Sequence, residues 1–184
     1  MPDDLISFEA KLRTPRDLKG TDPWLFLRLP QPASDRLPSR SMVSVEGTFQ
    51  GHEFFTTLEP DGEGGHWMRV EDGLIERAKV AEGFDVQIAI RPMDKEPEPK
   101  VPPDVQSAFD SAEPKARETW AAITPLARRD WIFWIASAKK QETRVKRIGV
   151  ALSKLSAGSR RPCCFDRSGM YDKSLSCPES IEEK

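Results

Sequence analysis

The chain has 184 residues and a formal net charge of −2; 38% of its residues are hydrophobic and 32% are charged. This length and apolar content can bury the core of one domain, or of a barrel with a helical appendage. No apolar run approaches the roughly 20 residues that cross a bilayer, and the acidic start lacks the regions of a signal peptide, so we expect a cytoplasmic protein. The three cysteines, Cys163, Cys164 and Cys177, do not form the pattern of a disulfide framework.

Charge is distributed unevenly along the chain. Residues 1–103 hold 13 Lys+Arg against 19 Asp+Glu, residues 104–161 hold 12 against 6, and residues 162–184 hold 3 against 5. An acidic first part followed by a basic second part indicates mutual docking, separate partners, or two solvated surfaces.

The first half of the chain alternates apolar and polar residues, a pattern typical of half-buried strands. Six strands are predicted, at residues 6–12, 24–29, 42–49, 52–58, 66–70 and 86–91. We expect turns at Gly51–His52 and at Asp61–Gly65, since glycine reaches positive φ without steric cost, and a short helix over residues 74–79. Six short, closely spaced strands predict a small, mostly antiparallel β-barrel over residues 1–93.

Residues 94–103 are rich in proline and predict an extended connector, because proline fixes φ and removes a backbone donor. About four short helices are predicted in residues 104–161, with Thr124 as the N-cap of the third and Gly158 closing the last. An apolar stripe of Trp131, Ile135, Ile148 and Leu152 should pack inward. The fold class is therefore α+β. We expect residues 162–184 to form a polar, flexible tail, in which residues 166–174 are either disordered or lie along the barrel.

The predicted third and fourth helices carry a distinctive pattern. Its positions are Trp134, Ile135, Ala138, Lys139, Glu142, Thr143, Arg144, Arg147 and Ile148. This pattern resembles the signature of the YdeI/OmpD-associated family, also called bacteriocin-protection proteins. The preceding segment, from Phe8 to about Asp94, resembles the DUF1905 domain in its glycine-containing turns. The family often has proline at the position of Gln141, which leaves open whether the third and fourth helices are separate.

The resemblance implies a binding or stress-tolerance protein linked to tolerance of antimicrobial peptides or bacteriocins, and it supplies no catalytic residues. The candidate binding residues of the signature are Lys139, Glu142, Thr143, Arg144 and Arg147. If a helix begins after Lys140, Thr143 or Gln141 should cap it, and Glu142 should lie in its first turn, where the helix dipole favours an anion. Arg144 and Arg147 are then expected to pair with carboxylates of the acidic barrel. The alternative is that they bind an anionic ligand between barrel and helices.

The basic residues of the predicted helices suggest a second function. They are Arg128, Arg129, Lys139, Lys140, Arg144, Lys146, Arg147, Arg160 and Arg161. Together with Trp131 or Trp134 they could form a nucleic-acid surface on which bases stack. Trp131, however, falls on the apolar stripe, and cations at helical spacing usually form a solvated face. The pattern therefore favours solvation over nucleic-acid binding.

His66 is the candidate for a third function, a ligand receptor or enzyme with a pocket at the barrel mouth. It follows a glycine turn, and Glu59, Asp61 or Glu63 could complete an acid–base pair with it. A structural position at a turn or rim is favoured, because nothing in the spacing requires catalysis. With only two histidines and vicinal cysteines, neither a metal nor a cofactor is expected. The sequence favours a non-enzymatic module whose acidic barrel binds a cationic peptide or protein.

Overall fold

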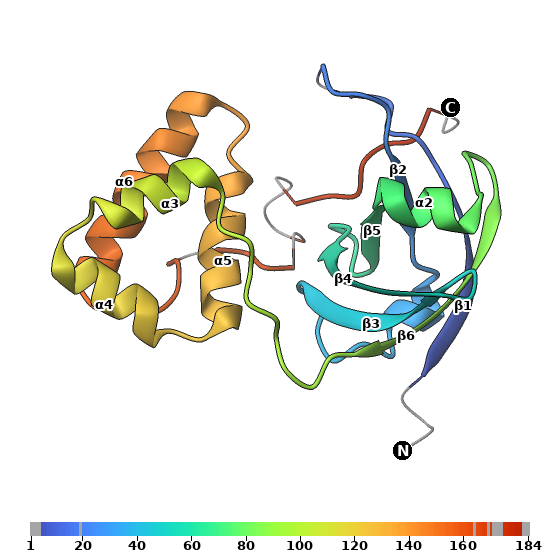
Figure 1. Ribbon diagram of the computed structural model, residues 1–184, viewed down its shortest axis with the longest axis horizontal. Helices are drawn as coiled ribbons and strands as arrows, with labels where there is room; N and C mark the ends of the chain where they lie inside the picture. Colours follow the sequence, from blue (N-terminus) through green and yellow to red (C-terminus); the bar gives the residue numbers. More distant parts are fainter. Residues whose placement is uncertain (1–4, 19, 164, 169, 171–174, 182–184) are drawn as a thin grey trace. The chain divides into compact units, whose positions relative to one another are not determined.

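The computed structural model describes residues 5–18, 20–163, 165–168, 170 and 175–181 (Figure 1). The chain divides into two compact units, which we call the barrel unit, Met1–Asp94 with Asp166–Lys184, and the helical unit, Lys95–Phe165. The predicted α+β class is confirmed. Within the described residues, no helix is both long enough and apolar enough to cross a membrane.

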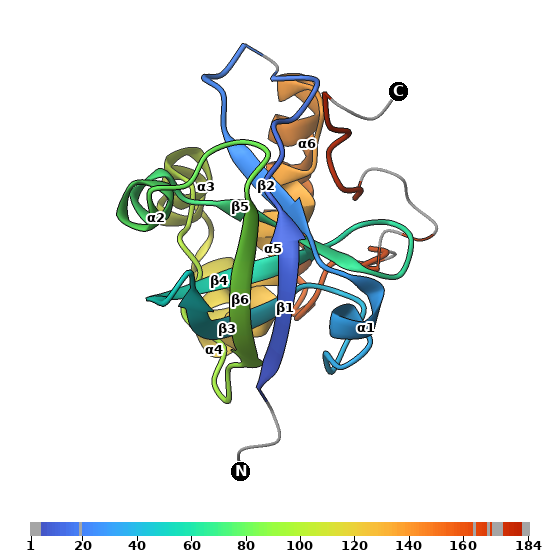
Figure 2. The ribbon, with the colours of Figure 1, turned by 90° about the vertical axis from the view of Figure 1, so that its right-hand side faces the viewer.

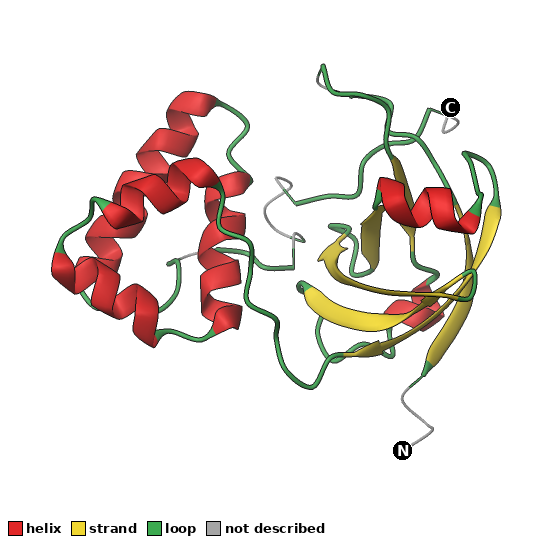
Figure 3. Cartoon of the chain, in the orientation of Figure 1, coloured by secondary structure: helices red, strands yellow, loops and turns green. Residues whose placement is uncertain are grey.

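The barrel unit is a six-stranded antiparallel sheet that is nearly closed (Figures 2 and 3). Its strands are β1 Ile6–Lys11, β2 Leu25–Arg28, β3 Val43–Phe49, β4 His52–Pro60, β5 His66–Val70 and β6 Asp85–Pro92, and its helices are α1 Gln31–Ser34 and α2 Asp72–Ala78. The strand order is β1-β6-β3-β4-β5-β2. Beyond β1, Arg13 exchanges two backbone hydrogen bonds of 2.9 Å with Phe26 of β2. This bridge brings the two edge strands together, so all six predicted strands belong to one barrel.

Alternation along the strands carries one set of side chains into the barrel core. Leu12, Leu27, Val45, Phe49 and Val86 are all fully buried there. Burying a side chain of this size stabilises the fold by about 1.5–3 kcal/mol relative to leaving it exposed. The apolar half of the alternation therefore fixes which face of each strand points inward.

The hairpin between β3 and β4 turns one residue earlier than predicted. Phe49 pairs with His52, which makes Gln50 and Gly51 the two turn residues. Their φ values are 49° and 80°. A two-residue turn with both φ angles positive matches the right-handed twist of the flanking strands. His52 therefore starts the strand and is not part of the turn.

The helical unit contains four helices, as predicted: α3 Pro103–Asp110, α4 Pro114–Ala122, α5 Pro125–Ala136 and α6 Gln141–Ser156. The hydroxyl of Thr124 accepts a hydrogen bond from the Ala127 backbone N–H at 3.3 Å, which confirms its role as N-cap. Trp131 and Ile135 are buried, and Ile148 and Leu152 pack against the same core while partly exposed.

Helices α5 and α6 are separate, with residues 137–140 between them. The N-cap of α6 is Lys140, and no side chain caps this end. The predicted caps, Gln141 and Thr143, are wrong, because both residues lie inside the first turn and not before it. Glu142 does occupy the first turn, as expected.

The C-terminal tail belongs to the barrel unit and not to the helical unit that precedes it in the chain. Its described residues 175–181 belong to the barrel unit, where Ser180 forms an antiparallel bridge with Pro15. Residues 175–181 therefore lie along the barrel. The two alternatives applied to residues 166–174, of which 169 and 171–174 lie outside the described residues. Cys163 is exposed and Cys177 is half-buried, while Cys164 lies outside the described residues.

Candidate functional site

An open groove of about 1320 Å³ lies in the barrel unit. It is lined by the β3–β4 hairpin, the end of β6, the start of β1 and the loop after α1. The apolar residues of its lining are Leu5, Ile6, Pro38, Phe54, Phe55, Pro92 and Met93. Phe55 is 70% exposed and Leu5 is 49% exposed. Large apolar side chains with this exposure beside a groove are typical of a binding surface.

Strand register places one aromatic and two charged residues of the groove in one row. Glu46 of β3 lies opposite Phe55 of β4 on one side and opposite Arg91 of β6 on the other. Because cross-strand partners share a face of the sheet, the three side chains emerge together. The Arg91 guanidinium donates two hydrogen bonds to one carboxylate oxygen of Glu46, at 3.0 Å and 2.7 Å.

The groove carries more negative than positive charge. Its lining holds the carboxylates of Glu46, Glu53 and Asp94 and the guanidinium groups of Arg36 and Arg91. Arg91 is already neutralised by Glu46. Glu53 and Asp94 form no ion pair with any other residue that the structure describes. Two carboxylates therefore remain available to a cationic ligand beside the exposed Phe55.

Gly47, in the lining of the groove, allows β6 to approach β3 closely. A Cβ at this position would lie 1.9 Å from the carbonyl oxygen of Ala89 and 2.8 Å from the Cα of Ile90. Both atoms belong to the backbone, so a side chain at residue 47 would force the two strands apart. Gly47 thus shapes the sheet on which the row of Phe55, Glu46 and Arg91 is presented.

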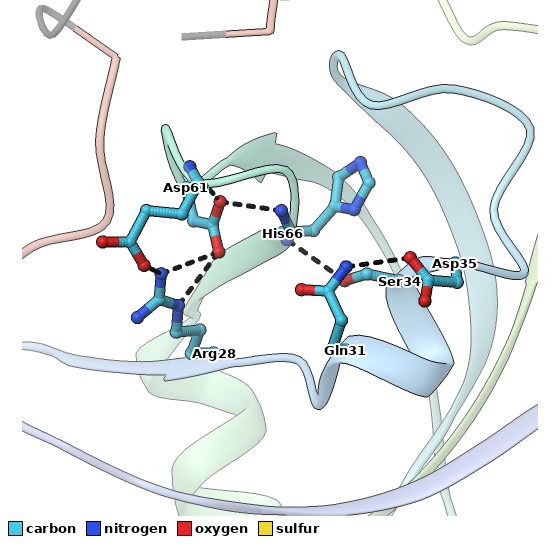
Figure 4. A network of polar contacts seen from close by, with 8 residues as sticks. Arg28, Gln31, Ser34, Asp35, Asp61 and His66 are labelled. Atoms are coloured by element: carbon cyan, nitrogen blue, oxygen red, sulfur yellow. Dashed lines mark hydrogen bonds and ion pairs between the residues drawn. The ribbon is translucent and has the colours of Figure 1, made fainter. Parts of the chain in front are cut away.

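A second polar cluster surrounds Asp61, at the turn between β4 and β5 (Figure 4). The Asp61 side chain is buried and accepts hydrogen bonds of 2.8 Å from the backbone N–H groups of Glu63 and Gly65, and one of 2.9 Å from Arg28 Nε. Burial acts to raise the pKa of Asp61, but the two backbone donors and Arg28 outweigh it, so the pKa is lowered. A Cβ on Gly65 would lie 2.5 Å from this carboxylate. These hydrogen bonds therefore stabilise the backbone conformation of the turn between β4 and β5.

His66 does not form the acid–base pair considered from the sequence. Its side chain is fully buried, and its Nε2 lies 3.0 Å from the carbonyl oxygen of Ser41. Its backbone N–H donates to the hydroxyl of Ser34 at 3.1 Å (Figure 4). Burial lowers the pKa of His66, although Ser41 and Asp61 act to raise it. These contacts indicate a structural role for the imidazole, which is not accessible to a ligand from solvent.

Arg144 and Arg147 find their partners inside the helical unit, which corrects the expectation that they pair with the barrel. Arg144 forms a two-pronged ion pair with Asp104 of α3, at 2.7 Å and 2.9 Å. Arg147 donates to the carbonyl oxygen of Trp134 and to the hydroxyl of Ser137, and its guanidinium lies 5.2 Å from the Trp134 ring centroid. Arg147 thus ties α6 to the end of α5, where carbonyl groups lack helical partners.

The remaining candidates of the signature are exposed. Lys139, Glu142 and Thr143 lie at the surface around the start of α6. Other cations proposed for nucleic-acid contact are engaged: Arg128 donates to the carbonyl groups of Trp120 and Ala121 and pairs with Glu98, and Arg129 pairs with Glu96. Trp131, proposed for base stacking, is buried. The structure therefore assigns several of the basic and aromatic residues of this segment to the fold.

Sequence reasoning missed the groove. Two adjacent phenylalanines in a predicted strand could have indicated an exposed aromatic side chain. Successive residues of a strand point to opposite faces, so either Phe54 or Phe55 must lie outside the core. Neither Glu53 nor Asp94 belongs to a recognisable sequence motif. Their proximity to Phe55 depends on strand register and on the path of β6, which the sequence alone does not specify.

The fold defines the class of protein, an α+β chain that joins a small antiparallel barrel to a four-helix unit. Residues 8–90 match the family model of the domain of unknown function DUF1905, and residues 98–158 match the model described as bacteriocin-protection, YdeI or OmpD-associated. The two matches reproduce the arrangement of a DUF1905 domain followed by a YdeI/OmpD-associated domain, and both resemblances are confirmed. A comparison with curated proteins finds no match.

Proposed function

We propose that this chain is a non-enzymatic cytoplasmic binding protein whose barrel groove takes a cationic, amphipathic peptide. The single observation that carries the proposal is the groove of about 1320 Å³, whose lining contains the exposed Phe55 together with Glu53 and Asp94. Neither carboxylate has an ion-pair partner among the residues that the structure describes. An apolar anchor with neighbouring negative charge is complementary to a peptide that has one apolar and one basic face.

The two parts of the groove have different tasks in this proposal. Covering a Phe side chain contributes about 1.5–3 kcal/mol, so Phe55 supplies affinity. Glu53 and Asp94 are solvent-exposed, so they contribute less affinity and act on encounter and orientation. Because their interactions are screened, binding should weaken as the salt concentration rises.

The family description supports the same class of ligand. The matched model of the helical unit is described as bacteriocin-protection, and the resemblance implies a link to tolerance of antimicrobial peptides. The engaged arginines of the helical unit leave fewer cations for an anionic partner. We therefore assign the groove a cationic peptide and the helical signature a largely structural role.

A binding titration with the full chain tests this proposal. A fluorescent amphipathic peptide of lysine and leucine should bind the wild-type chain, and Phe55→Ser should weaken binding about tenfold or more, since each tenfold corresponds to about 1.4 kcal/mol. Phe84→Ser is the matched control, because Phe84 is also on the barrel unit and 49% exposed but lies outside the groove. Its effect should stay below about twofold.

Two outcomes would contradict the proposal. One is equal weakening by Phe55→Ser and Phe84→Ser, which would indicate unspecific apolar association. The other is an affinity that stays constant as salt rises, which would exclude a role for the carboxylates.

A further inference from the structure

The C-terminal segment 175–181 extends the barrel sheet beyond β1. Ser180 lies opposite Pro15 in an antiparallel bridge. The Arg16 N–H donates to the Glu179 carbonyl at 2.8 Å, and the Ile181 N–H donates to the Thr14 carbonyl at 3.2 Å. These two bonds flank the Pro15–Ser180 pair, so Pro15 occupies a position that needs no donor. The segment is bound as an added strand.

Side chains give this added strand a preferred chemistry. Arg16 pairs with the Glu179 carboxylate at 2.9 Å, and Arg13 donates to the Ser180 hydroxyl at 3.1 Å. Ser180 is 1% exposed, whereas Glu179 and Ile181 are exposed. The edge thus offers two guanidinium groups to a strand with a carboxylate followed by a small hydroxyl residue.

Space remains beside the bound segment. A pocket of about 370 Å³ lies between residues 176–179 and the barrel, and its lining includes Phe26 and the cationic groups of Lys11, Arg13 and Arg28. The carboxylates of Asp61 and Glu63 also line it, and both pair with Arg28. On its other side, the Cys177 N–H donates to the carbonyl oxygen of Asp61 at 3.2 Å. The turn stabilised by Asp61 therefore also contributes a backbone acceptor to the edge.

We propose that the barrel edge formed by residues 13–16 and the carbonyl group of Asp61 is a docking site for extended, acidic peptide segments of a partner protein. The chain's own residues 175–181 occupy this edge as a built-in competitor. The occupant class follows from the segment seated there: backbone hydrogen bonds supply affinity, and the Arg16–Glu179 pair selects a carboxylate. This site stands apart from the groove in both location and the charge of its ligand.

Competition within the chain sets the expected affinity. A tethered segment acts at an effective concentration of the order of millimolar, so a free peptide must displace it. Loosening the tail should therefore reveal binding that the wild-type chain masks. Glu179→Ala with Ile181→Pro removes the ion pair and the N–H donor to Thr14, and both positions are exposed, so the barrel core is unchanged.

The test is fluorescence anisotropy with a labelled peptide of residues 175–181, with serine in place of Cys177. The peptide should bind the loosened full-length variant at least about tenfold more tightly than it binds the wild-type chain. Adding Arg16→Glu to the loosened variant should abolish binding, and a peptide with lysine at the position of Glu179 should restore it. Arg77→Glu, an exposed change on α2, is the control and should leave binding unaltered.

Equal peptide affinity for the wild-type and loosened chains, or no binding to the loosened chain, would overturn the proposal. So would tight binding of the lysine peptide while Arg16 is intact. Amide exchange provides a check that needs no variant. The Arg16 amide of the wild-type chain should be protected by Glu179, and exchange at the rate of an unfolded chain would show that the edge is not occupied.

Discussion

The arginines of the helical signature and the carboxylates of the barrel groove differ in whether they have partners within the chain. In the helical unit, Arg144 and Arg147 have acceptors within the unit itself. In the barrel groove, Glu53 and Asp94 have no ion-pair partner among the described residues, and Phe55 is 70% exposed. A dense run of cations in the sequence thus marks a region that stabilises its own fold. The candidate binding surface is instead the barrel groove, where an apolar side chain is exposed and two carboxylates have no ion-pair partner among the described residues.

The largest expected effect is at Gly47, where the groove depends on close backbone approach. Gly47→Ala should lower the free energy of unfolding by about 3 kcal/mol, because the added Cβ meets the Ala89 carbonyl. Urea denaturation measures the loss. Gly149→Ala on α6 is the control, since a Cβ there has open space, and it should raise stability by up to about 1 kcal/mol. Equal stability of the two variants would show that strand spacing at Gly47 is not limiting.

The next effect concerns the link between α5 and α6. Arg147→Ala removes the hydrogen bonds to Trp134 and Ser137 and the contact with the indole ring, which should cost about 2 kcal/mol. Thermal or urea unfolding checks this value against Lys146→Ala, an exposed neighbour whose loss should cost less than about 0.5 kcal/mol. If Arg147→Ala is as mild as Lys146→Ala, Arg147 is free for a ligand and the contrast between the units fails.

A third prediction uses the pH dependence of the barrel unit. Burial raises the pKa of Glu59 from 4.5 to about 7. The folded state therefore disfavours the ionised form of Glu59. The stability that comes with its neutral form is fully present below pH 4.5 and is lost as pH rises through 7. Glu59→Gln should stabilise the chain at pH 8 by about 1–2 kcal/mol and have little effect at pH 4. Unfolding curves across this range measure the difference, and an equal effect at both pH values would contradict it.

The smallest effect is expected at the Arg144–Asp104 pair. The Arg144 side chain is 19% exposed and that of Asp104 is 41% exposed, so water screens their attraction. A double-mutant cycle with Arg144→Ala and Asp104→Ala should give a coupling of about 0.2–1 kcal/mol. A coupling of zero would remove the structural role given to Arg144 and return it to the set of candidate binding residues.

The sequence predicted the parts of the molecule that depend on local patterns. Alternation located all six strands, and Thr124 with Pro125 located the start of α5, because a cap and its first turn are neighbours in the chain. Long-range choices were not predictable in this way. Nothing local to Arg144 indicates that its partner is Asp104 and not a barrel carboxylate. The groove likewise depends on strand register and on the close contact at Gly47.

Mapping the bound peptide by NMR tests the central claim most directly. Backbone amide shifts of the full chain would be recorded during titration with the cationic amphipathic peptide. We expect the largest changes on the β3–β4 hairpin around Phe55 and on Arg91, the residues of the groove. Changes confined to Lys139, Thr143 and their neighbours at the start of α6 would contradict it and would place the binding surface on the helical unit.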